Sequence, residues 1–320
     1  YFIPQGEWML AAILYAFAAV GFSGGNVFYD SLIVSVSNNE NRNRVSALGY
    51  SLGYLGGGLL FLVNVIMFLN PQFFGIENQP NAILISFVMV AFWWAFFSIP
   101  ILRNVSESDT QKQEPRFFKA ILQSFNEVYQ TLMEVRKYKN VAIFLLAYWF
   151  YMDGIDTIVR MATAYGSDIG LEASSMITAL ILTQFVGFPS TLIFGYFADK
   201  IGFKKIISIG ILIYILISIF ASRITTATEF YLMAVVVGLV MGGVQAVSRA
   251  YFSSIIPEDK EAQFFGFYNL VGKSAVVAGP ALLAWISMIF NTPRAGILGL
   301  LILFIPGLIL LWMVPTQKNS

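Results

Sequence analysis

Nine separate apolar runs, each long enough for a helix of about 20 residues, limit most strongly how this chain can fold. A helix of that length crosses the hydrocarbon core of a bilayer. Only 12% of the 320 residues are charged and 58% are hydrophobic, whereas soluble domains are about 25% charged. The sequence therefore predicts an all-α polytopic membrane protein. The expected spans are 9–35, 45–69, 81–102, 141–166, 172–198, 205–222, 229–249, 263–288 and 295–314.

The basic residues are distributed unequally between the two sides that alternating joins would face. Of the 19 Lys and Arg residues, 15 fall on one side, seven of them in the long join 103–140, and only Arg223 and Arg294 on the other. Because basic loops stay in the cytoplasm, we expect the N-terminus of this chain outside the cell and the C-terminus in the cytoplasm.

The long polar join 103–140 divides the chain into an expected N-terminal bundle, 1–102, and an expected C-terminal bundle, 141–320. From Pro115 onward its apolar residues recur at helical spacing. We expect an amphipathic helix there, lying along the cytoplasmic membrane face. A linker between two bundles is the simpler interpretation, and a regulatory element is the alternative.

Several function classes are disfavoured by what the sequence lacks. It contains no Cys and no His, which excludes disulfides, Cys/His metal sites, thiol nucleophiles and imidazole bases. The net charge of +1 comes from few, balanced charges and by itself says nothing about nucleic acid or acidic partners. We expect no nucleic-acid partner and no cofactor, although proton or ion coupling is possible. Tyr29-Asp30 resembles half of the signature of an intramembrane aspartyl protease, but the Gly-x-Gly-Asp half is missing. We therefore expect a protein that is not an enzyme.

Two stretches of the chain resemble each other. Gly24-Gly25 and Gly242-Gly243 each lie near the end of an expected span. Each is followed by a polar loop and then by a segment that contains Gly and Tyr. The two stretches are offset by 218 residues. Six spans separate them. A parallel repeat of six-helix halves is the architecture of the major facilitator fold.

The loop from Gly195 to Lys205 carries a second signal. It contains Gly195, Asp199, Lys200 and Gly202 and resembles the major facilitator signature G-x-x-x-D-[RK]-x-G-[RK]-[RK], with Phe203 as an extra residue. The glycines permit a tight turn, and Asp199 would lie near the positive N-terminus of the span that begins at Arg44. We interpret these residues as a conformational brace. The repeat offset places a first copy of this loop before Tyr1, so the nine spans are interpreted as helices 4–12 of twelve.

Whole phrases resemble the vacuole-effluxer-like branch of the major facilitator superfamily. They include Arg44-Val45-Ser46-Ala47-Leu48-Gly49-Tyr50, Asp153-Gly154-Ile155-Asp156 and Gly242-Gly243-Val244-Gln245-Ala246-Val247-Ser248-Arg249. The resemblance covers most of the chain apart from 70–140. Its fungal members are implicated in amino-acid release from the vacuole. With short loops and no Cys or His, the chain looks like a bacterial member, and this implies a monomeric inner-membrane protein with a small-molecule substrate.

Four charged residues lie inside expected spans, where a charge is costly and usually faces a cavity or a partner. Asp153 lies about 18 Å into its span by helical rise. Asp156 and Arg160 follow on the same helical face, and Lys273 lies at a similar depth in another span. We interpret the four as a polar cavity, with Asp153 on its surface as the candidate carrier of a coupling proton. Structural ion pairs, Asp156 with Arg160 and Asp153 with Lys273, are the alternative.

Five neutral polar residues are added to these candidates because of their expected depth in the spans. They are Gln184, Asn269, Tyr151, Gln245 and Asn26. Each is a candidate for substrate contact, and interhelical hydrogen bonding is the alternative. Asp30 is expected to pair with Arg249 as a cytoplasmic gate or brace, and Asp156 with Arg160 as an outer gate.

Gly49, Gly53 and Gly57 recur every four residues, a spacing that predicts close helix packing. Taken together, the sequence predicts a secondary transporter that moves an amino acid or similar small polar solute by alternating access. A non-transporting scaffold or lipid-interacting protein is the alternative.

Overall fold

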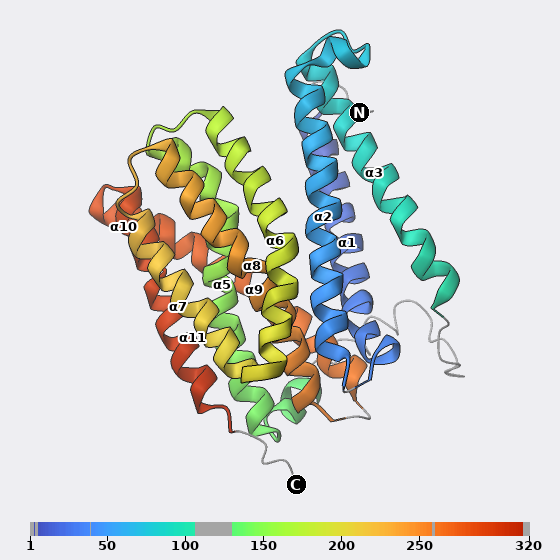
Figure 1. Ribbon diagram of the computed structural model, residues 1–320, viewed down its shortest axis with the longest axis vertical. Helices are drawn as coiled ribbons and strands as arrows, with labels where there is room; N and C mark the ends of the chain where they lie inside the picture. The colour runs from blue at the N-terminus through green and yellow to red at the C-terminus, as the bar shows by residue number, and fades with distance from the viewer. Residues whose placement is uncertain (1–2, 4–5, 39, 106–129, 258–259, 316–320) are drawn as a thin grey trace. The chain divides into compact units, whose positions relative to one another are not determined.

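The computed structural model describes residues 3, 6–38, 40–105, 130–257 and 260–315. These residues are helical throughout, apart from short joins, and nine helices among them are long and apolar enough to cross a membrane. The helices are α1 (Trp8–Val36), α2 (Arg42–Leu69), η1 (Pro71–Phe74), α3 (Gln79–Asn104), α5 (Lys139–Asp168), α6 (Ala173–Ile201), α7 (Phe203–Ala221), α8 (Ala227–Ile255), α9 (Glu261–Phe290), α10 (Pro293–Gly299) and α11 (Leu301–Met313) (Figure 1). The predicted all-α membrane architecture is confirmed, and α10 and α11 share the last expected span.

The chain forms two compact units, the first comprising Tyr1–Ser23 and Gly56–Glu127. Aromatic rings contact one another along α3 of this unit, where the tilted rings of Trp93 and Phe97 have centroids 4.7 Å apart. Many of its large apolar side chains are exposed, including those of Phe17 and Phe92. Such side chains suit a helix surface that meets lipid chains.

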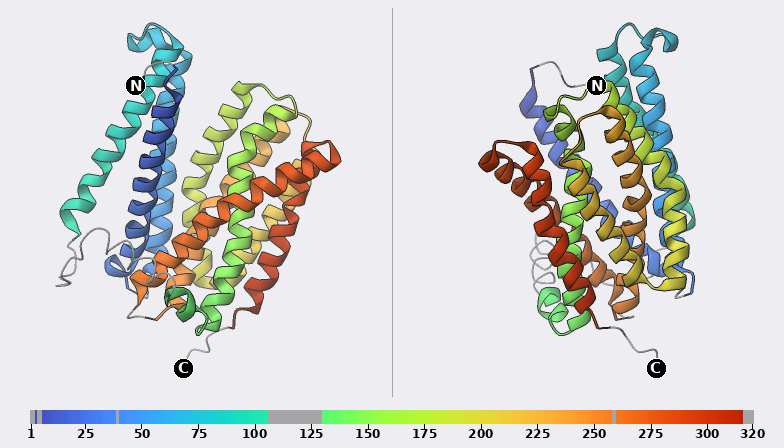
Figure 2. Two further views of the ribbon diagram at one scale, coloured as in Figure 1. Left: turned by 180° about the vertical axis from the view of Figure 1, so that it is seen from behind. Right: turned by 60° about the vertical axis from the view of Figure 1, so that its left-hand side comes forward.

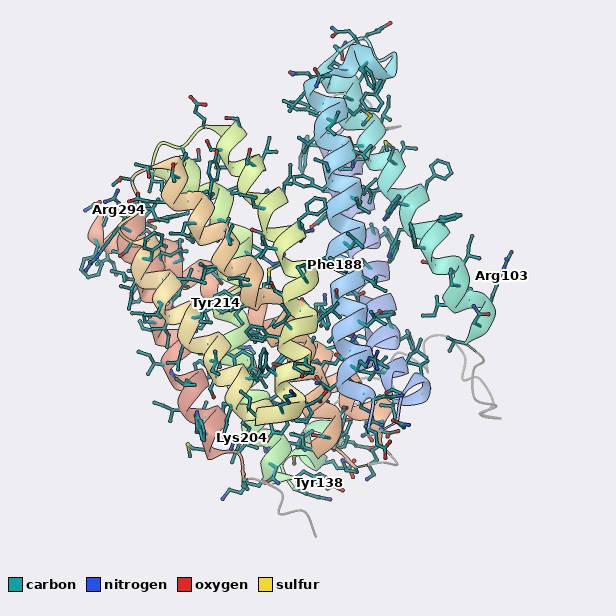
Figure 3. The ribbon with its side chains drawn as sticks, viewed as in Figure 1. Arg103, Tyr138, Phe188, Lys204, Tyr214 and Arg294 are labelled. Atoms are coloured by element: carbon teal, nitrogen blue, oxygen red, sulfur yellow. The ribbon has the colours of Figure 1, made fainter. Side chains whose placement is uncertain are left out.

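The second unit comprises Gly24–Leu55 and Val128–Ser320. In it α5 packs against α9 and α11, and α8 packs against α6 and α7 (Figure 2). At each end of the unit a basic side chain binds a backbone carbonyl of another segment, either at a helix end or in a join between helices. Lys204 Nζ donates to the carbonyl of Val314 at 2.6 Å, and Arg294 Nη2 donates to that of Ile224 at 2.9 Å (Figure 3).

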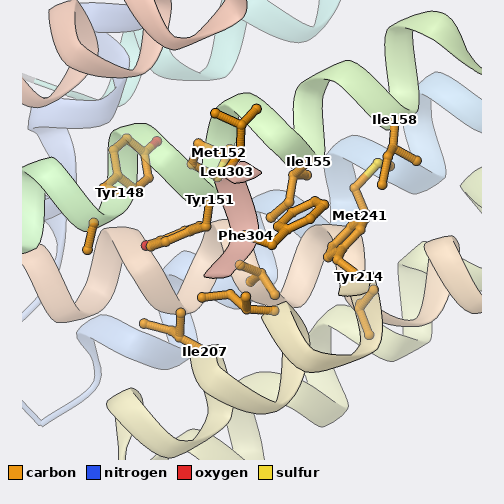
Figure 4. Packing of buried hydrophobic residues seen from close by; sticks show 14 of the residues in the cluster. Tyr148, Tyr151, Met152, Ile155, Ile158, Ile207, Tyr214, Met241, Leu303 and Phe304 are labelled. Atoms are coloured by element: carbon orange, nitrogen blue, oxygen red, sulfur yellow. The ribbon is translucent and has the colours of Figure 1, made fainter. Parts of the chain in front are cut away.

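The core of the second unit is built from aromatic rings fitted against glycines. Tyr214 stacks on Phe304 with ring centroids 5.7 Å apart (Figure 4). The Phe304 ring occupies the space beside Gly154, where an added Cβ would come within 2.7 Å of it. Glycine on α5 therefore permits α11 to pack closely against the helix that carries Asp153 and Asp156.

Residues 24–55, the second half of α1 and the first half of α2, belong to the same compact unit as the C-terminal helices. The expected division into bundles 1–102 and 141–320 is drawn at the long join between them. That division stays a prediction. Most of the expected amphipathic helix from Pro115 lies outside the described residues. Its described part, 130–135, is helical, and Glu134 there forms an ion pair with Lys260.

Candidate functional site

A cavity of about 490 Å³ lies within the second unit, between residues 24–55 and the C-terminal helices. Pockets for small molecules span roughly 300–1,000 Å³. The lining residues are Asn26, Tyr29, Asp30, Gly49, Tyr50, Gly53, Tyr54, Tyr148, Met152, Asp156, Arg160, Gln184, Gln245, Arg249, Tyr268, Asn269, Gly272, Lys273 and Val276. They come from α1, α2, α5, α6, α8 and α9. The cavity therefore has the size and the polar lining of a binding site for a small polar solute.

One pair of charges in the lining joins α1 to α8. Arg249 Nη1 donates to Asp30 Oδ1 at 3.0 Å, and both side chains are largely buried, 5% and 15% exposed. Arg249 Nε also donates to Ser46 Oγ at 3.0 Å, and its guanidinium lies 4.7 Å from the centre of the Tyr50 ring. The expected Asp30–Arg249 pair is present, and its guanidinium is held by groups from both α1 and α2.

The other charges in the lining belong to the middle parts of α5 and α9. Asp156, Arg160 and Lys273 all line the cavity. The charged groups that act most strongly on the Asp156 carboxyl are Arg160 and Lys273. Asp156 and Arg160 share a helical face, as expected from their spacing, so this group combines one acidic and two basic residues.

Four of the five neutral polar candidates also line the cavity: Gln184, Asn269, Gln245 and Asn26. Tyr54 Oη donates to Gln245 Oε1 at 3.3 Å, and Asn269 Nδ2 donates to the carbonyl of Phe265 at 3.1 Å. Tyr151 is absent from the lining. It is fully buried, and its hydroxyl hydrogen-bonds Ser248 Oγ at 2.8 Å.

Asp153 is the main correction to the expected site. It is fully buried, but it is not among the residues that line the cavity. Its carboxyl group is directed at the backbone of Gly279 on α9, and neither oxygen has a hydrogen bond of normal geometry within the described part of the chain. The alternative interpretation, an ion pair of Asp153 with Lys273, is not found among the described ion pairs either. The reason is the close approach of α9, which Gly279 permits and which covers this face of α5.

Tyrosines form a part of the lining that the sequence interpretation missed. Tyr50, Tyr54 and Tyr148 line the cavity, and Tyr148 stacks on Tyr268 with ring centroids 4.3 Å apart. A signal was available, because Tyr50 and Tyr54 lie four residues apart on the face of α2 that also carries Gly53. In α2 the two tyrosines and Gly53 together form the face turned toward the cavity.

The expected packing role is wrong for one of the regularly spaced glycines. Gly53 lines the cavity, and an added Cβ there would have no heavy atom within 4 Å. Close packing against α2 instead uses glycines of the facing helices. The ring of Tyr54 fills the space beside Gly187 on α6 and Gly242 on α8. On α2, the lack of a side chain at Gly53 widens the cavity.

The signature loop lies at the end of the unit where α6 ends and α2 begins, here called the Asp199 end. Asn43 Nδ2 donates to Asp199 Oδ1 at 2.7 Å and to the carbonyl of Gly195 at 2.7 Å. The structure thus brings Asp199 to the N-terminus of α2, as expected, but its partner is Asn43. Arg44 is exposed and has no contact with Asp199 among the described interactions. The ammonium of Lys200 lies 4.3 Å from the centre of the Tyr196 ring.

Two glycines of this loop have separate tasks. Gly202 has φ of +97° and ends α6 by donating its N–H to the carbonyl of Ala198, a conformation that suits glycine. Gly195 is buried against α2, where an added Cβ would lie 2.7 Å from that of Ala47. The first makes the turn to α7, and the second permits close contact between α6 and α2.

The described residues include no group of three or more His, Cys, Asp or Glu side chains arranged to hold a metal ion. The acidic residues of the lining, Asp30 and Asp156, are accompanied by basic residues. The cavity offers ionic and hydrogen-bonding groups to a solute.

Comparison with known proteins identifies the relatives of this chain. Residues 34–320 match the family described as "Vacuole effluxer Atg22 like". The chain is similar to an uncharacterized MFS-type transporter, YxiO of Bacillus subtilis, with 37% identity over all of this chain and 74% of that protein. It is also similar to autophagy-related protein 22 of Kluyveromyces lactis, with 24% identity over 84% of this chain and 56% of that protein.

Among solved structures, the fucose:proton symporter FucP of E. coli has a similar fold. The TM-score is 0.62 at 9% identity, and the match covers 91% of this chain and 73% of that one. The chain therefore has the major facilitator fold of an integral membrane transporter, and it belongs to the Atg22-like vacuole effluxer family.

Proposed function

We propose that this protein is a secondary carrier that moves an amino acid, or a polar solute of similar size, across the membrane by alternating access. The observation that carries the proposal is the cavity of about 490 Å³ within the second unit. Five ionisable acidic and basic residues line it, together with amide and hydroxyl groups. Charged groups inside a membrane protein typically mark a solute pathway.

The contacts at the Asp199 end support a gate on one side of that cavity. Asn43 on α2 binds Asp199 on α6, and Ser46 on α2 donates to the carbonyl of Ala246 on α8 at 2.8 Å. Arg249 adds its ion pair to α1. Breaking this set of polar contacts would weaken the attachment of α1 and α2 to α6 and α8 at this end. We propose that the contacts hold the Asp199 end closed in this conformation.

The sidedness of the proposal comes from the basic residues. Arg42, Lys200 and Lys205 all belong to the Asp199 end. Because such residues favour the cytoplasmic side, we assign the Asp199 end to the cytoplasm and place the C-terminus there. In this assignment the gate closes the cavity toward the cytoplasm.

Proton coupling is the further part of the proposal. Asp153 remains the candidate proton carrier. It lies on α5, the helix that also presents Asp156 to the cavity. A rearrangement of α5 against α9 would be needed to connect Asp153 with the solute. Uptake driven by an imposed pH gradient, in wild type and Asp153→Asn, tests this part separately.

The transport proposal is tested with a substitution that fills the cavity. A side chain at Gly53 has open space before it, so Gly53→Leu is expected to lower uptake of radiolabelled amino acids into liposomes without changing thermal stability. Gly266 on α9 also has open space for a Cβ but does not line the cavity, so Gly266→Leu is the matched control. The experiment uses the full-length protein.

The alternative is a scaffold or lipid-interacting protein. It predicts no uptake for the wild type and no selective thermal stabilisation by any solute, whereas a carrier is stabilised by what it binds. Equal uptake by wild type and Gly53→Leu would also contradict the assignment of this cavity as the solute site.

A further inference from the structure

A second cavity, of about 140 Å³, lies at the Asp199 end and shares no lining residue with the larger one. Arg42 and Asn43 at the start of α2 form one wall. The other walls come from Ser253 at the end of α8 and from the first residues of α7 and α9, Phe203 and Glu261. All of these belong to the second unit. The cavity, here called the gate pocket, therefore lies where the proposed gate joins α2 to the C-terminal helices.

Asn43 turns an unsatisfied hydrogen-bond acceptor toward this pocket. Its side chain is 4% exposed, and its Nδ2 donates to Asp199 and to the carbonyl of Gly195, both on α6. Its Oδ1 is buried and has no hydrogen-bond partner in the part of the chain that the structure describes. The nitrogen and the oxygen of an amide point in divergent directions, and α6 contributes no residue to the pocket. With Nδ2 bound to α6, Oδ1 therefore lies on the pocket side.

Arg42 brings an unsatisfied donor to the same pocket. Its Nη1 donates to the carbonyl of Ser253 at 3.3 Å. Its Nε is buried without a hydrogen-bond partner among the described residues. The described ion pairs are those of Arg249 and Lys260, so Arg42 is held by no carboxylate within this part of the chain. A guanidinium in such a setting suits a carboxylate, to which it can donate two parallel hydrogen bonds.

Oxygen atoms and a carboxylate surround the rest of the pocket. The Ser253 hydroxyl donates to the carbonyl of Ala250 at 2.7 Å, which leaves its oxygen able to accept. Glu261 makes the α9 wall acidic and forms no ion pair with Arg42 among those described. A simple anion would satisfy Arg42 but meet the oxygens of Asn43 and Glu261, and a simple cation would meet the guanidinium. A zwitterion satisfies both parts of the lining.

The size of the pocket limits the zwitterion to a small one. The volume of 140 Å³ equals that of roughly five water molecules in the liquid. Glycine and alanine have about this number of non-hydrogen atoms. Ser254 lines the pocket and is exposed, so the pocket reaches the surface there. With the Asp199 end assigned to the cytoplasm, a small amino acid in the cytoplasm can enter it.

We propose that the gate pocket binds a small α-amino acid from the cytoplasm. The carboxylate binds Arg42, and the ammonium group lies between Oδ1 of Asn43 and the hydroxyl oxygen of Ser253. Opening the gate moves α2 away from α8 and so separates these partners. The amino acid therefore binds the closed gate more tightly than the open one and shifts the population toward the closed gate. Its binding is independent of transport, whereas its effect on transport rests on the proposed function.

Binding of radiolabelled glycine to the full-length protein, measured by equilibrium dialysis, tests the site. The Gly53→Leu substitution is included throughout because it fills the larger cavity, so that glycine bound by this variant is bound elsewhere. Acetate and methylamine each carry one half of the zwitterion. Each should compete for the site with at least about tenfold lower affinity than glycine, because each lacks one charged hydrogen-bonding group.

Four substitutions locate the site and its link to the gate. Arg42→Gln removes the partner of the carboxylate and should weaken glycine binding at least about tenfold. Arg44 is exposed and lies outside the pocket lining, so Arg44→Gln is the matched control and should keep the affinity. Ser254→Phe places a ring at the exposed rim and should prevent binding without changing thermal stability. Ser46 joins α2 to α8 and does not line the pocket, so Ser46→Ala should weaken binding only through the gate.

Transport assays measure the consequence of binding. Glycine on the cytoplasmic face should lower the rate at which wild type in liposomes takes up a second, radiolabelled amino acid. The inhibition should be smaller in Ser254→Phe, where only competition at the larger cavity remains. Equal inhibition of the two proteins would overturn the effect on the gate.

The outcomes separate the inference from the proposed function. No saturable glycine binding in Gly53→Leu means that the pocket holds water only, which overturns the inference and leaves the carrier function standing. Binding that survives Arg42→Gln or Ser254→Phe overturns the assigned site, and acetate that competes as well as glycine overturns the zwitterion. An unchanged affinity in Ser46→Ala overturns the link to the gate. Glycine binding that depends on Arg42 in a protein that takes up no solute overturns the proposed function alone.

Discussion

Asn43, at the start of α2, donates a hydrogen bond of 2.7 Å to the carboxylate of Asp199, at the end of α6. The same amide nitrogen donates to the carbonyl of Gly195. Asn43 is only 4% exposed, whereas Asp199 is exposed, so its bond to Gly195 is shielded from water and its bond to Asp199 is partly shielded. The negative charge of Asp199 also lies at a helix N-terminus, where it is stabilised by the helix dipole. This pair is the natural target for testing the proposed gate.

Asp199→Ala is expected to lower the rate of transport more than the affinity for solute. It removes the acceptor for Asn43 and leaves a buried donor with one bond fewer, a loss of about 1–3 kcal/mol. The measurements are initial uptake rates and half-saturation concentrations in liposomes. The exchanged variant Asn43→Asp with Asp199→Asn keeps one charge and one amide at this contact and should recover part of the rate. A larger effect on affinity than on rate would contradict a gating role.

Removing Arg249 should destabilise the protein strongly. Arg249→Met leaves Asp30 buried without its partner, and breaking a buried pair costs about 3–5 kcal/mol. Asp30→Asn with Arg249→Met should be less destabilised than Arg249→Met alone, because no isolated charge remains. Thermal unfolding of the purified variants measures both effects.

The ion pair of Glu134 with Lys260 provides the comparison. Its side chains are more exposed, 23% and 31%, and exposed pairs contribute about 0–1 kcal/mol. Lys260→Met should therefore change the unfolding temperature much less than Arg249→Met. Equal losses in the two variants would show that burial does not distinguish the pairs.

A methyl group added at Gly195 should disturb the contact between α6 and α2. Its Cβ would lie 2.7 Å from the Cβ of Ala47, and overpacking typically costs about 1–3 kcal/mol. Ala47→Gly removes the opposing methyl group at a helix cost of roughly 1 kcal/mol. The double variant should then be more stable than the sum of the two single effects implies. Strict additivity of the unfolding free energies would contradict direct contact.

Asp153→Asn should retain the fold. The Asp153 side chain is buried without a hydrogen bond of normal geometry in the described part of the chain, so loss of an ionised form removes no described ion pair. If Asp153 carries the coupling proton, the variant should lose accumulation driven by a pH gradient but keep exchange of solute. Uptake and exchange assays in liposomes distinguish the two activities. An unfolded Asp153→Asn protein would instead support a structural ion pair.

Much of the architecture could be predicted from the sequence because hydropathy is a local property. Each span must bury about 20 apolar residues in lipid, so nine runs predict nine helices without knowledge of their packing. The same logic selected Asp156, Arg160 and Lys273, since charges within spans need polar surroundings. The Asp199 loop was predictable because its glycines and charges follow a known pattern.

Tertiary packing decided which face of each helix meets the cavity. Asp153 and Asp156 lie one turn apart, yet only Asp156 lines the cavity, because α9 approaches closely at Gly279 and covers Asp153. Asn43 and Arg44 are neighbours in the chain, yet only Asn43 reaches Asp199. Successive residues on a helix point about 100° apart, so a small rotation changes the partner. The sequence determined the helices and the depth of their charges, whereas the contacts between helices determined which of those charges face the solute.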